Sequence, residues 1–350
     1  MREPLCNKRQ AFLIANIFIG TKILLRSIFL FVVILLLSAC QDRDMIIIRY
    51  AHVGVKNEPQ SRFADEVAKI VNNKTEGRLE MRVYPNSQLG NISELVDGVK
   101  YGFIGMSHHD FSSLSKFHKD LSVFNAPYIF RDVDHALLAT NPQTSPILSG
   151  INKQLIENSG VRILGSFYRG ARQLTTDFPV YSTNDLKGKK IRGVPFPIWM
   201  SMIRGMGAIP TPVEFSELTT ALMTGLVVGQ ENPLSNIYAS KIYEVQSHIC
   251  MTNHMHSCLC VFIHDKLWQK ITMKDRQIIL EAISEVTLMA VQWIRESDEQ
   301  IKQELASKGL VFIDENNGLD IRNIKSSVLK QINSDFPEWT NYIDEIQKIQ

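Results

Sequence analysis

Two arginines, Arg172 and Arg192, have the chemistry to hold a small carboxylate away from water. A planar guanidinium group offers two parallel N–H donors to a carboxylate, whereas a lysine ammonium group offers a point charge. Arg192 ends a short strand predicted at 190–192, and we expect its side chain to project into a crevice. Arg172 lies in the sequence GARQLTT at 170–176. The alternative for either arginine is a solvated surface position or an ion pair within the protein.

Asn232 and Phe215 can contact the same ligand in different ways. Asn232 follows a strand predicted at 227–230, in position to bond a carboxylate or a hydroxyl through its amide group. An asparagine before a proline also suits a turn. Phe215 can pack on the carbon skeleton of a ligand or, equally, in the core.

His108, His109 and Asp110 follow a strand predicted at 104–107. Ligands of open α/β sheets lie at the carboxyl ends of strands, which puts these three side chains at a candidate binding edge. We expect them to bind hydroxyl groups of a ligand. The alternative is a loop cluster without function.

One stretch alternates histidines and cysteines at His254, His256, Cys258 and Cys260. In a strand all four would face one side, about 6.6–7 Å apart, whereas the ligands of one zinc ion lie about 2.0–2.3 Å from the metal. One strand cannot close such a site, so we expect a strand crossing a buried or cleft-facing surface, with no metal or cofactor. Beyond residue 40 the chain has three cysteines, Cys250, Cys258 and Cys260. Their odd number and their spacing do not match a disulfide framework.

Motifs of common enzyme classes are missing from the sequence. It contains no G-x-S-x-G elbow, no Walker loop, no G-x-G-x-x-G after a strand and no H-E-x-x-H. We therefore expect a binding protein and not an enzyme.

The elements that must position these residues alternate between strands and helices. Strands predicted at 46–52 and 79–84 flank an amphipathic helix from 61 to 75. The pattern recurs and begins afresh after Arg172, which predicts two α/β halves with parallel strands. The remaining predicted elements are helices at 92–101, 132–139, 145–158, 198–206 and 216–224, and strands at 104–107, 161–167, 190–192, 209–213 and 227–230.

A single long helix is predicted from 274 to 307, a stretch with no proline or glycine and with apolar residues at helical spacing. A helix of about 34 residues is about 50 Å long, so we expect it to lie across both halves. A coiled coil is disfavoured because no strict heptad is sustained.

The first 40 residues are predicted to be an export signal. Lys22 and Arg26 precede an uncharged run that is short for a membrane span and suits a signal-peptide core. The run ends in Leu-Ser-Ala-Cys, which resembles the lipobox of bacterial lipoproteins, so we expect acylation of Cys40 and a lipid anchor. The absence of aspartate after Cys40 favours the outer membrane by the same resemblance. The alternatives are a cleaved signal with Cys40 as a bystander and a retained anchor.

Charge excludes nucleic acid as the main partner. The chain has 350 residues with 38 basic and 36 acidic side chains, and 45% of the residues are hydrophobic. Residues 1–40 hold five of the basic groups and one of the acidic ones, so 33 basic and 35 acidic groups remain in the rest. A near-neutral body without a basic block does not suit phosphate binding.

Four ordered segments of the chain resemble the solute-binding subunits of TRAP transporters, the DctP family. They are YPNSQLG at 84–90, GARQLTT at 170–176, DLKGKKIR at 185–192 and GQENPL at 229–234. The resemblance spans about residues 46 to 313. It implies an α/β, periplasmic-binding-protein-like fold with two lobes around a cleft, crossing strands, and a long C-terminal helix that spans both lobes.

The lobes are expected to use discontinuous parts of the chain. Lobe 1 would comprise 41–169 and about 258–297, and lobe 2 would comprise 170–257 and about 298–350. The crossing strands, near Arg169 and at 255–264, would let the lobes close on a ligand.

The resemblance also implies a function. It predicts a monomeric periplasmic receptor that captures an organic acid and delivers it to the integral-membrane subunits of a permease driven by an ion gradient. By resemblance Arg192 is the principal carboxylate clamp, Arg172 the second arginine, and Asn232 and Phe215 lie near the ligand. A receptor that feeds a sensor kinase would carry the same motifs.

The identity of the acid stays open at this point. A sugar acid such as a hexuronate or an aldonate fits the polar side chains around His108, whereas a C4-dicarboxylate would need another cation there. Sialic acid is a third option, disfavoured because no arginine follows shortly after Asp110.

Overall fold

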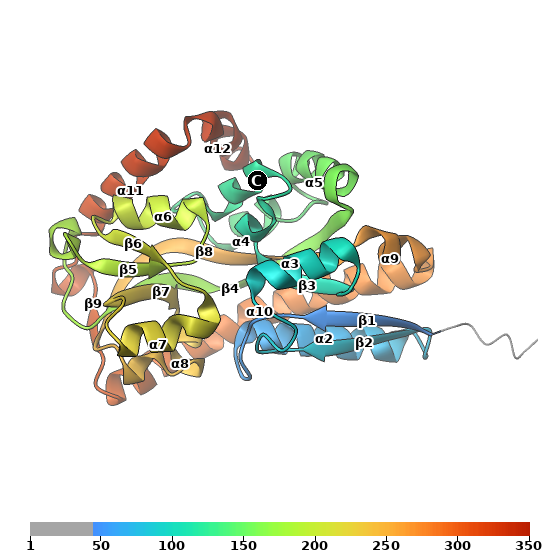
Figure 1. Cartoon of the computed structure of the whole chain (residues 1–350), viewed down its shortest axis with the longest axis horizontal. Helices are drawn as coiled ribbons and strands as arrows, with labels where there is room; N and C mark the ends of the chain where they lie inside the picture. The colour runs from blue at the N-terminus through green and yellow to red at the C-terminus, as the bar shows by residue number, and fades with distance from the viewer. Residues whose placement is uncertain (1–44) are drawn as a thin grey trace, which may run out of the picture. The chain divides into compact units, whose positions relative to one another are not determined.

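Two long strands, β4 (Val161–Thr176) and β8 (His248–His264), pair antiparallel at the centre of a nine-stranded sheet. The computed structural model describes residues 45–350, so the predicted signal peptide at 1–40 and its Cys40 lie outside the described residues. Both strands are long enough to serve the two halves of the fold (Figure 1). The strand predicted at 161–167 was too short, because β4 continues through Arg172.

The other strands flank this central pair in the order β2-β1-β3-β8-β4-β7-β5-β6, with β9 paired to β8. On one side β1 pairs parallel with β2 and β3, and on the other β5 pairs parallel with β6 and β7. We call the half that contains β1–β3 lobe 1 and the half that contains β5–β7 lobe 2. The strands are β1 (Ile46–Ala51), β2 (Leu79–Tyr84), β3 (Met106–Asp110), β5 (Lys190–Gly193), β6 (Ile209–Pro212), β7 (Gly229–Pro233) and β9 (Val311–Ile313).

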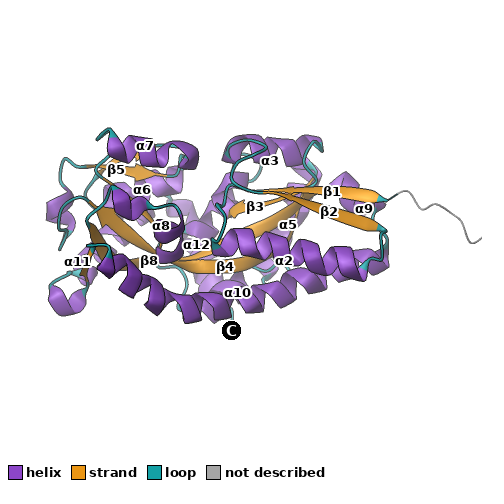
Figure 2. Cartoon of the chain, turned by 90° about the horizontal axis from the view of Figure 1, so that it is seen from below, coloured by secondary structure: helices purple, strands orange, loops and turns teal. Residues whose placement is uncertain are grey.

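Helices cover the sheet in both lobes, which confirms the predicted α/β class (Figure 2). The seven predicted helices lie within two residues of their predicted bounds, because their apolar spacing and capping residues are local signals, whereas α8, α9, α11 and α12 were not predicted. The helices are α2 (Pro59–Lys74), α3 (Ile92–Tyr101), α4 (Val133–Ala139), α5 (Pro146–Ser159), α6 (Pro197–Gly205), α7 (Leu218–Met223), α8 (Leu234–Ala239), α9 (Asp265–Lys270), α10 (Met273–Ser307), α11 (Ile321–Asp335) and α12 (Thr340–Gln347).

The predicted long helix is α10, which runs along the fold under α2, β4 and α8 (Figure 2). Its first half contributes Ile279 and Val286 to an apolar core with α2, and its end contributes Leu305 to a separate core with α7 and α8. Its 35 residues make it about 52 Å long. The helix is long and apolar enough to cross a membrane, but its apolar face is buried in these two cores.

The C-terminal helices divide between the lobes. The helix α11 packs closely on α6 of lobe 2, where a side chain at Gly205 would stand 2.7 Å from the backbone of Val328. The helix α12 lies instead against lobe 1, where His135 Nε2 is 2.9 Å from the carbonyl oxygen of Ile346. The prediction that 298–350 belongs entirely to lobe 2 was therefore wrong for α12, which contacts α5 of lobe 1 and whose Ile346 is buried. The other lobe boundaries stay a prediction.

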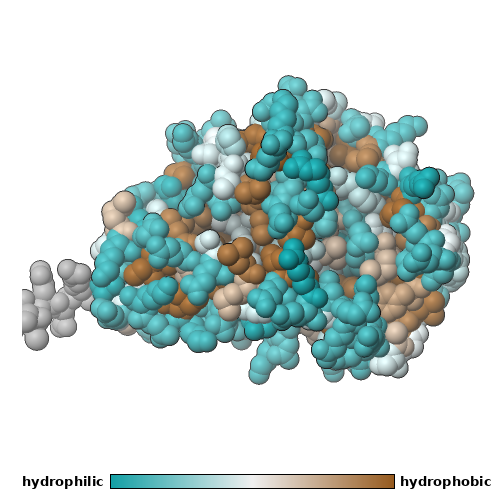
Figure 3. All heavy atoms as spheres, turned by 180° about the vertical axis from the view of Figure 1, so that it is seen from behind, coloured by the Kyte–Doolittle hydropathy of each residue, from teal (hydrophilic) through white to brown (hydrophobic). Residues whose placement is uncertain are grey.

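The surface seen from behind is mainly hydrophilic, with apolar residues in small separate patches (Figure 3). Such scattered apolar exposure is normal for a protein that faces water.

Candidate functional site

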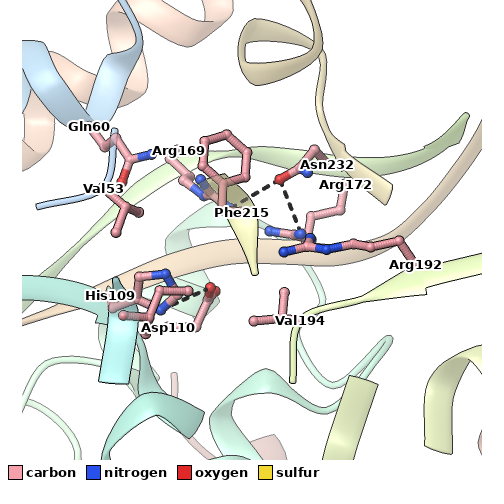
Figure 4. Close-up of a pocket in the computed structure, with 11 residues that line it drawn as sticks. Val53, Gln60, His109, Asp110, Arg169, Arg172, Arg192, Val194, Phe215 and Asn232 are labelled. Carbon is pink, nitrogen blue, oxygen red and sulfur yellow. Dashed lines mark hydrogen bonds and ion pairs between the residues drawn. The ribbon is translucent and has the colours of Figure 1, made fainter. Parts of the chain in front are cut away.

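A narrow cavity lies between the two lobes beside the middle of β4 (Figure 4). Six of the seven predicted ligand residues line it: Arg172, Arg192, Asn232, Phe215, His109 and Asp110. Val53, Gln60, Ile92, Arg169 and Val194 complete the wall. The topology brings these segments together, because β3 ends on one side of the cleft and β5 and β7 end on the other.

His108 does not line the cavity, so its predicted contact with a ligand was wrong. Successive side chains of a strand point to opposite faces, and β3 extends through Asp110, so His108 and His109 diverge. The ring of His108 lies in the core of lobe 1, where Nδ1 is 2.7 Å from Tyr50 Oη and the ring stacks on His52 at 4.8 Å. Burial lowers the pKa of His108 well below its usual range.

Arg192 brings a positive charge into the cavity without a carboxylate partner among residues 45–350. Its Nε donates to the carbonyl oxygen of Val213 at 2.8 Å, which fixes the guanidinium, and neither Nη group has a hydrogen-bond partner in the described chain. The residue is 1% exposed. Burial lowers the pKa of Arg192 to about 10, so the group is still a cation at neutral pH.

Arg172 is held by a buried carboxylate, Glu231 of β7. Its Nε and Nη2 donate to the two oxygens of Glu231, which also accepts bonds from Trp199 Nε1 at 3.0 Å and from His254 Nε2 at 3.0 Å. Burial alone would raise the pKa of Glu231, but Arg172 and His254 outweigh it and hold the value at about 2. Among the described residues, Nη1 is the Arg172 nitrogen without a partner. Arg172 can thus offer a ligand the two N–H groups of Nη1, while its charge is already balanced by Glu231.

Asn232 lies within β7 and not after it, and its amide is mostly occupied. Its Oδ1 accepts from Arg169 at 3.4 Å and from Arg172 at 3.2 Å, and its Nδ2 donates to Gln230 Oε1 at 2.6 Å. One N–H of the amide is left for a ligand.

Arg169 is a cavity residue that the sequence analysis did not select. It lies on β4, three residues before Arg172, and its neighbour Gly170 has a φ of 119°, a conformation that favours glycine. The register between β4 and β8 shifts at this point, so both arginines reach the cleft. Arg169 Nη1 donates to Glu58 Oε1 at 3.3 Å, which pairs its charge.

The lobe 1 wall presents acceptors without donors. Asp110 Oδ1 and Gln60 Oε1 of the lining, and Glu58 Oε2 beside Arg169, are buried and have no hydrogen-bond partner among the described residues. Burial lowers the pKa of His109 to about 4, so its ring is neutral at physiological pH. Buried acceptors without partners cost free energy, and donors from a ligand would satisfy them.

Phe215 is half-buried at the rim of the cavity, where lobe 2 meets Val53 of lobe 1. The same two residues also line a second hollow toward the outside. The inner cavity has a volume of about 20 Å³, room for about one water molecule, and is too small for an organic acid as it stands.

Comparison with known proteins identifies the family. The profile described as bacterial extracellular solute-binding protein, family 7 (DctP) matches residues 50–335. The chain belongs to this family. Its members bind small acids outside the cytoplasm and work with TRAP permeases, and the family is not one of enzymes. The predicted family and the extracytoplasmic location are thereby confirmed.

Individual relatives agree with this assignment. A solute-binding protein of Roseobacter denitrificans is 29% identical over 274 residues, covering 78% of this chain and 82% of that protein. Its crystal structure with bound L-galactonate superposes with a TM-score of 0.79 at 26% identity, over 87% of this chain and all of that one. An Actinobacillus succinogenes TRAP solute-binding protein, also with L-galactonate, gives 0.79 and 26% over 86% and 99%.

A relative named for another ligand is equally similar. The C4-dicarboxylate-binding periplasmic protein DctP of Rhodobacter capsulatus is 29% identical over 279 residues, 79% of this chain and 82% of that protein. Overall similarity therefore does not select the acid.

Proposed function

We propose that this chain is the receptor of a TRAP transporter for a hydroxylated monocarboxylate, a sugar acid such as an aldonate or a hexuronate. The observation that carries the proposal is the balance of unpaired groups around the cavity. Among residues 45–350, Arg192 has no carboxylate partner, and Asp110 and Gln60 of the lining each supply an acceptor without a donor, with a further one on Glu58 behind Arg169. One carboxylate and several hydroxyl groups satisfy this set.

A C4-dicarboxylate is the second candidate, because Arg169 adds the further cation that such a ligand needs. Two facts weigh against it. The charge of Arg169 is paired with Glu58, and a second ligand carboxylate would lie near the carboxylate of Asp110. Like charges in a buried site repel strongly, whereas hydroxyl groups would donate to the same oxygens. L-Galactonate in the two related structures agrees with the sugar-acid choice.

A thermal-shift screen of the chain without residues 1–40 tests the proposal. The panel contains L-galactonate, D-galacturonate and D-glucuronate against succinate, malate and sialic acid, at constant pH and ionic strength. A ligand at 100 times its dissociation constant stabilises the protein by about 2.7 kcal/mol. We expect the largest rise in Tm with a sugar acid. A response to dicarboxylates alone would reverse the choice of ligand.

We also propose that the receptor is a monomer, that it does not turn over its ligand, and that it is anchored through an acylated Cys40, with the outer membrane preferred. Mass spectrometry of the native protein should find a lipid-modified cysteine at the N-terminus. An unmodified N-terminus at or beyond Gln41 would contradict the anchor.

A further inference from the structure

A third hollow, of about 460 Å³, lies against the long strand β8. We call it the rear hollow. It is formed by residues 126–131 of lobe 1, by 251–256 of β8, and by the start of α11, which packs on lobe 2. Its charged and polar lining consists of Tyr128, Arg131, Thr252, Asn253, His256, Glu315, Arg322 and Lys325.

The strand β8 separates the rear hollow from the ligand cavity. Its residue His254 contacts Glu231, the partner of Arg172, at 3.0 Å, and its Ser257 contacts the cavity residue Arg169 at 3.2 Å. Asn253 and His256 of the same strand line the rear hollow. The two sites therefore share the strand on which the lobes hinge, on opposite sides of it.

Three cations meet at the rear hollow without a carboxylate partner among residues 45–350: Arg131, Arg322 and Lys325. Arg131 donates to two carbonyl oxygens, of Gln347 at 2.7 Å and Ile349 at 2.8 Å. Lys325 lies 5.3 Å from the centre of the Tyr128 ring. These partners leave the positive charges in place, and the one acid in the lining is Glu315. Asp132 adjoins Arg131 in the chain.

The cations come from both sides of the hinge, because Arg131 belongs to lobe 1 and the other two to the helix that packs on lobe 2. All three side chains are exposed, so water and salt weaken their mutual repulsion, and a bound anion would be attracted by all three charges. The Nδ1 atom of His256, also in the lining, is buried with no hydrogen-bond partner in the described chain and adds a polar contact.

The backbone at the rear hollow is also held in an unusual conformation. Tyr128 has a φ of 58° and Asn253 a φ of 42°, values that residues with side chains seldom adopt. Hydrogen bonds to neighbouring strands hold both residues: Tyr128 N donates to the His254 carbonyl at 2.9 Å, and Asn253 N donates to Gln173 Oε1 at 2.9 Å. Strained residues that the surroundings hold in place are characteristic of binding and switch regions.

We propose that the rear hollow binds a small polyvalent oxyanion, a phosphate or polycarboxylate compound, and that this binding changes the affinity of the cleft for its acid. The anion bridges Arg131 of lobe 1 to Arg322 and Lys325 of α11 and so stabilises one arrangement of the lobes. Coupling between two sites is reciprocal, so the acid in the cleft changes the affinity for the anion by the same factor.

The test measures the Tm of the chain without residues 1–40 in pyrophosphate and, separately, in citrate, with sodium chloride adjusted to constant ionic strength. The two probes distinguish phosphate from carboxylate chemistry. An anion at about ten times its dissociation constant should raise the Tm by about 3 °C. The variant Arg322→Gln/Lys325→Gln should lose this rise. The control Lys153→Gln/Lys330→Gln removes the same charge from exposed positions outside the hollow and should keep it.

Two further arms separate this proposal from the proposed function. The variant Arg192→Ala should keep the anion response, because the cleft does not hold the probe; loss of the response there would place the anion in the cleft. Calorimetry with the best acid of the screen should show an affinity changed about fivefold or more by the effective probe. No Tm rise in the wild type, or an equal rise in Arg322→Gln/Lys325→Gln, would overturn the site. A rise without a changed affinity would overturn the coupling.

Discussion

The two walls of the cleft differ in how their polar groups are satisfied. On the lobe 2 wall Glu231 collects donors from Arg172, Trp199 and His254, so that wall is a closed network with Arg192 beside it. On the lobe 1 wall Asp110 and its neighbours leave acceptors without donors, above a layer of buried neutral histidines.

We infer from this difference that the two walls have different roles in binding. A network with every charge paired is rigid and holds Arg192 ready for a carboxylate at little cost in reorganisation. A wall with unsatisfied acceptors gains most from a ligand whose hydroxyl groups match it, so it determines which acid binds. Changes to the first wall should damage the fold or all binding, and changes to the second should alter selectivity.

The largest effect is expected from Glu231→Gln, which leaves Arg172 buried with its charge unpaired. Breaking one partner out of a buried ion pair costs about 3–5 kcal/mol, and the free energy of unfolding should fall by that amount. Chemical denaturation measures it. The matched control is Asp335→Asn, which breaks the surface pair with Arg204 and should cost less than about 1 kcal/mol. Equal losses in the two variants would show that the network does not stiffen the lobe 2 wall.

The next effect is that of Arg192→Ala on the affinity for the acid. Removing the unpaired cation leaves the ligand carboxylate buried without its partner, at a cost of about 2–5 kcal/mol, or about 30- to several-thousand-fold in Kd. Arg192→Lys should recover part of the loss, because an ammonium group lacks the planar fork. Calorimetry measures both variants.

Two comparisons make the Arg192 result specific. Arg204→Ala, an exposed arginine, should bind like the wild type. The ligand-free Arg192→Ala protein should lose much less stability than Glu231→Gln, because the change leaves behind the carbonyl of Val213 and no carboxylate partner in the described chain. Binding close to that of the wild type would place the carboxylate elsewhere, with the free Nη1 of Arg172 as the first candidate.

The lobe 2 wall was also the wall that the sequence could predict. Arg172, Arg192 and Asn232 lie in short motifs with a fixed order along the chain, and all three line the cavity. The lengths of β4 and β8 were underestimated, because register shifts between them, and two glycines in β4, interrupt the alternation that marks a strand. As a result the reach of Arg169 into the cleft was missed. The strand β7 was placed two residues too early, which put Asn232 after it and not inside it.

The lobe 1 wall depends on contacts that the sequence does not reveal. The strand β3 was placed two residues too early, which hid the alternation that separates His108 from His109. Gln60 and Glu58 follow β1 with no motif around them, and their role appears when Glu58 meets Arg169 and Asn236 from distant parts of the chain. Long-range pairing of this kind leaves no spacing signal in the sequence. The one available signal was that adjacent residues of a strand point to opposite faces, so His108 and His109 cannot both face the cleft.

The lobe 1 wall can be tested through Asp110→Asn, which keeps the shape of the side chain and removes the negative charge. Loss of a charged acceptor for a ligand hydroxyl should cost about 1–3 kcal/mol, or about 5- to 150-fold in affinity for a sugar acid. Succinate should lose nothing and gain relative to the sugar acid, since its second carboxylate no longer meets a like charge. Titration calorimetry with both acids decides this. The exposed pair partner Asp97 gives the control Asp97→Asn, which should leave both affinities unchanged.

The smallest expected effect is that of pH on the free energy of unfolding. It compares His52 of lobe 1 with Glu231 of lobe 2. Burial lowers the pKa of His52 to about 4, and its Nδ1 already accepts from Gly54 N at 3.1 Å, so a proton on that nitrogen would break the contact. The unfolded chain binds this proton near pH 6.5, so between about pH 6.5 and 4 the unfolded state holds more protons than the folded one. The free energy of unfolding should therefore fall as the pH is lowered through that window, by about 1–2 kcal/mol from this histidine at pH 5. Glu231, with its pKa at about 2, should keep the lobe 2 network charged throughout the window.

Denaturation at pH 8, 6 and 5 measures this effect. The free energy of unfolding should depend less steeply on pH in His52→Gln than in the wild type or in the partly exposed control His118→Gln. An identical slope in His52→Gln and the wild type would mean that acid acts first on another part of the molecule.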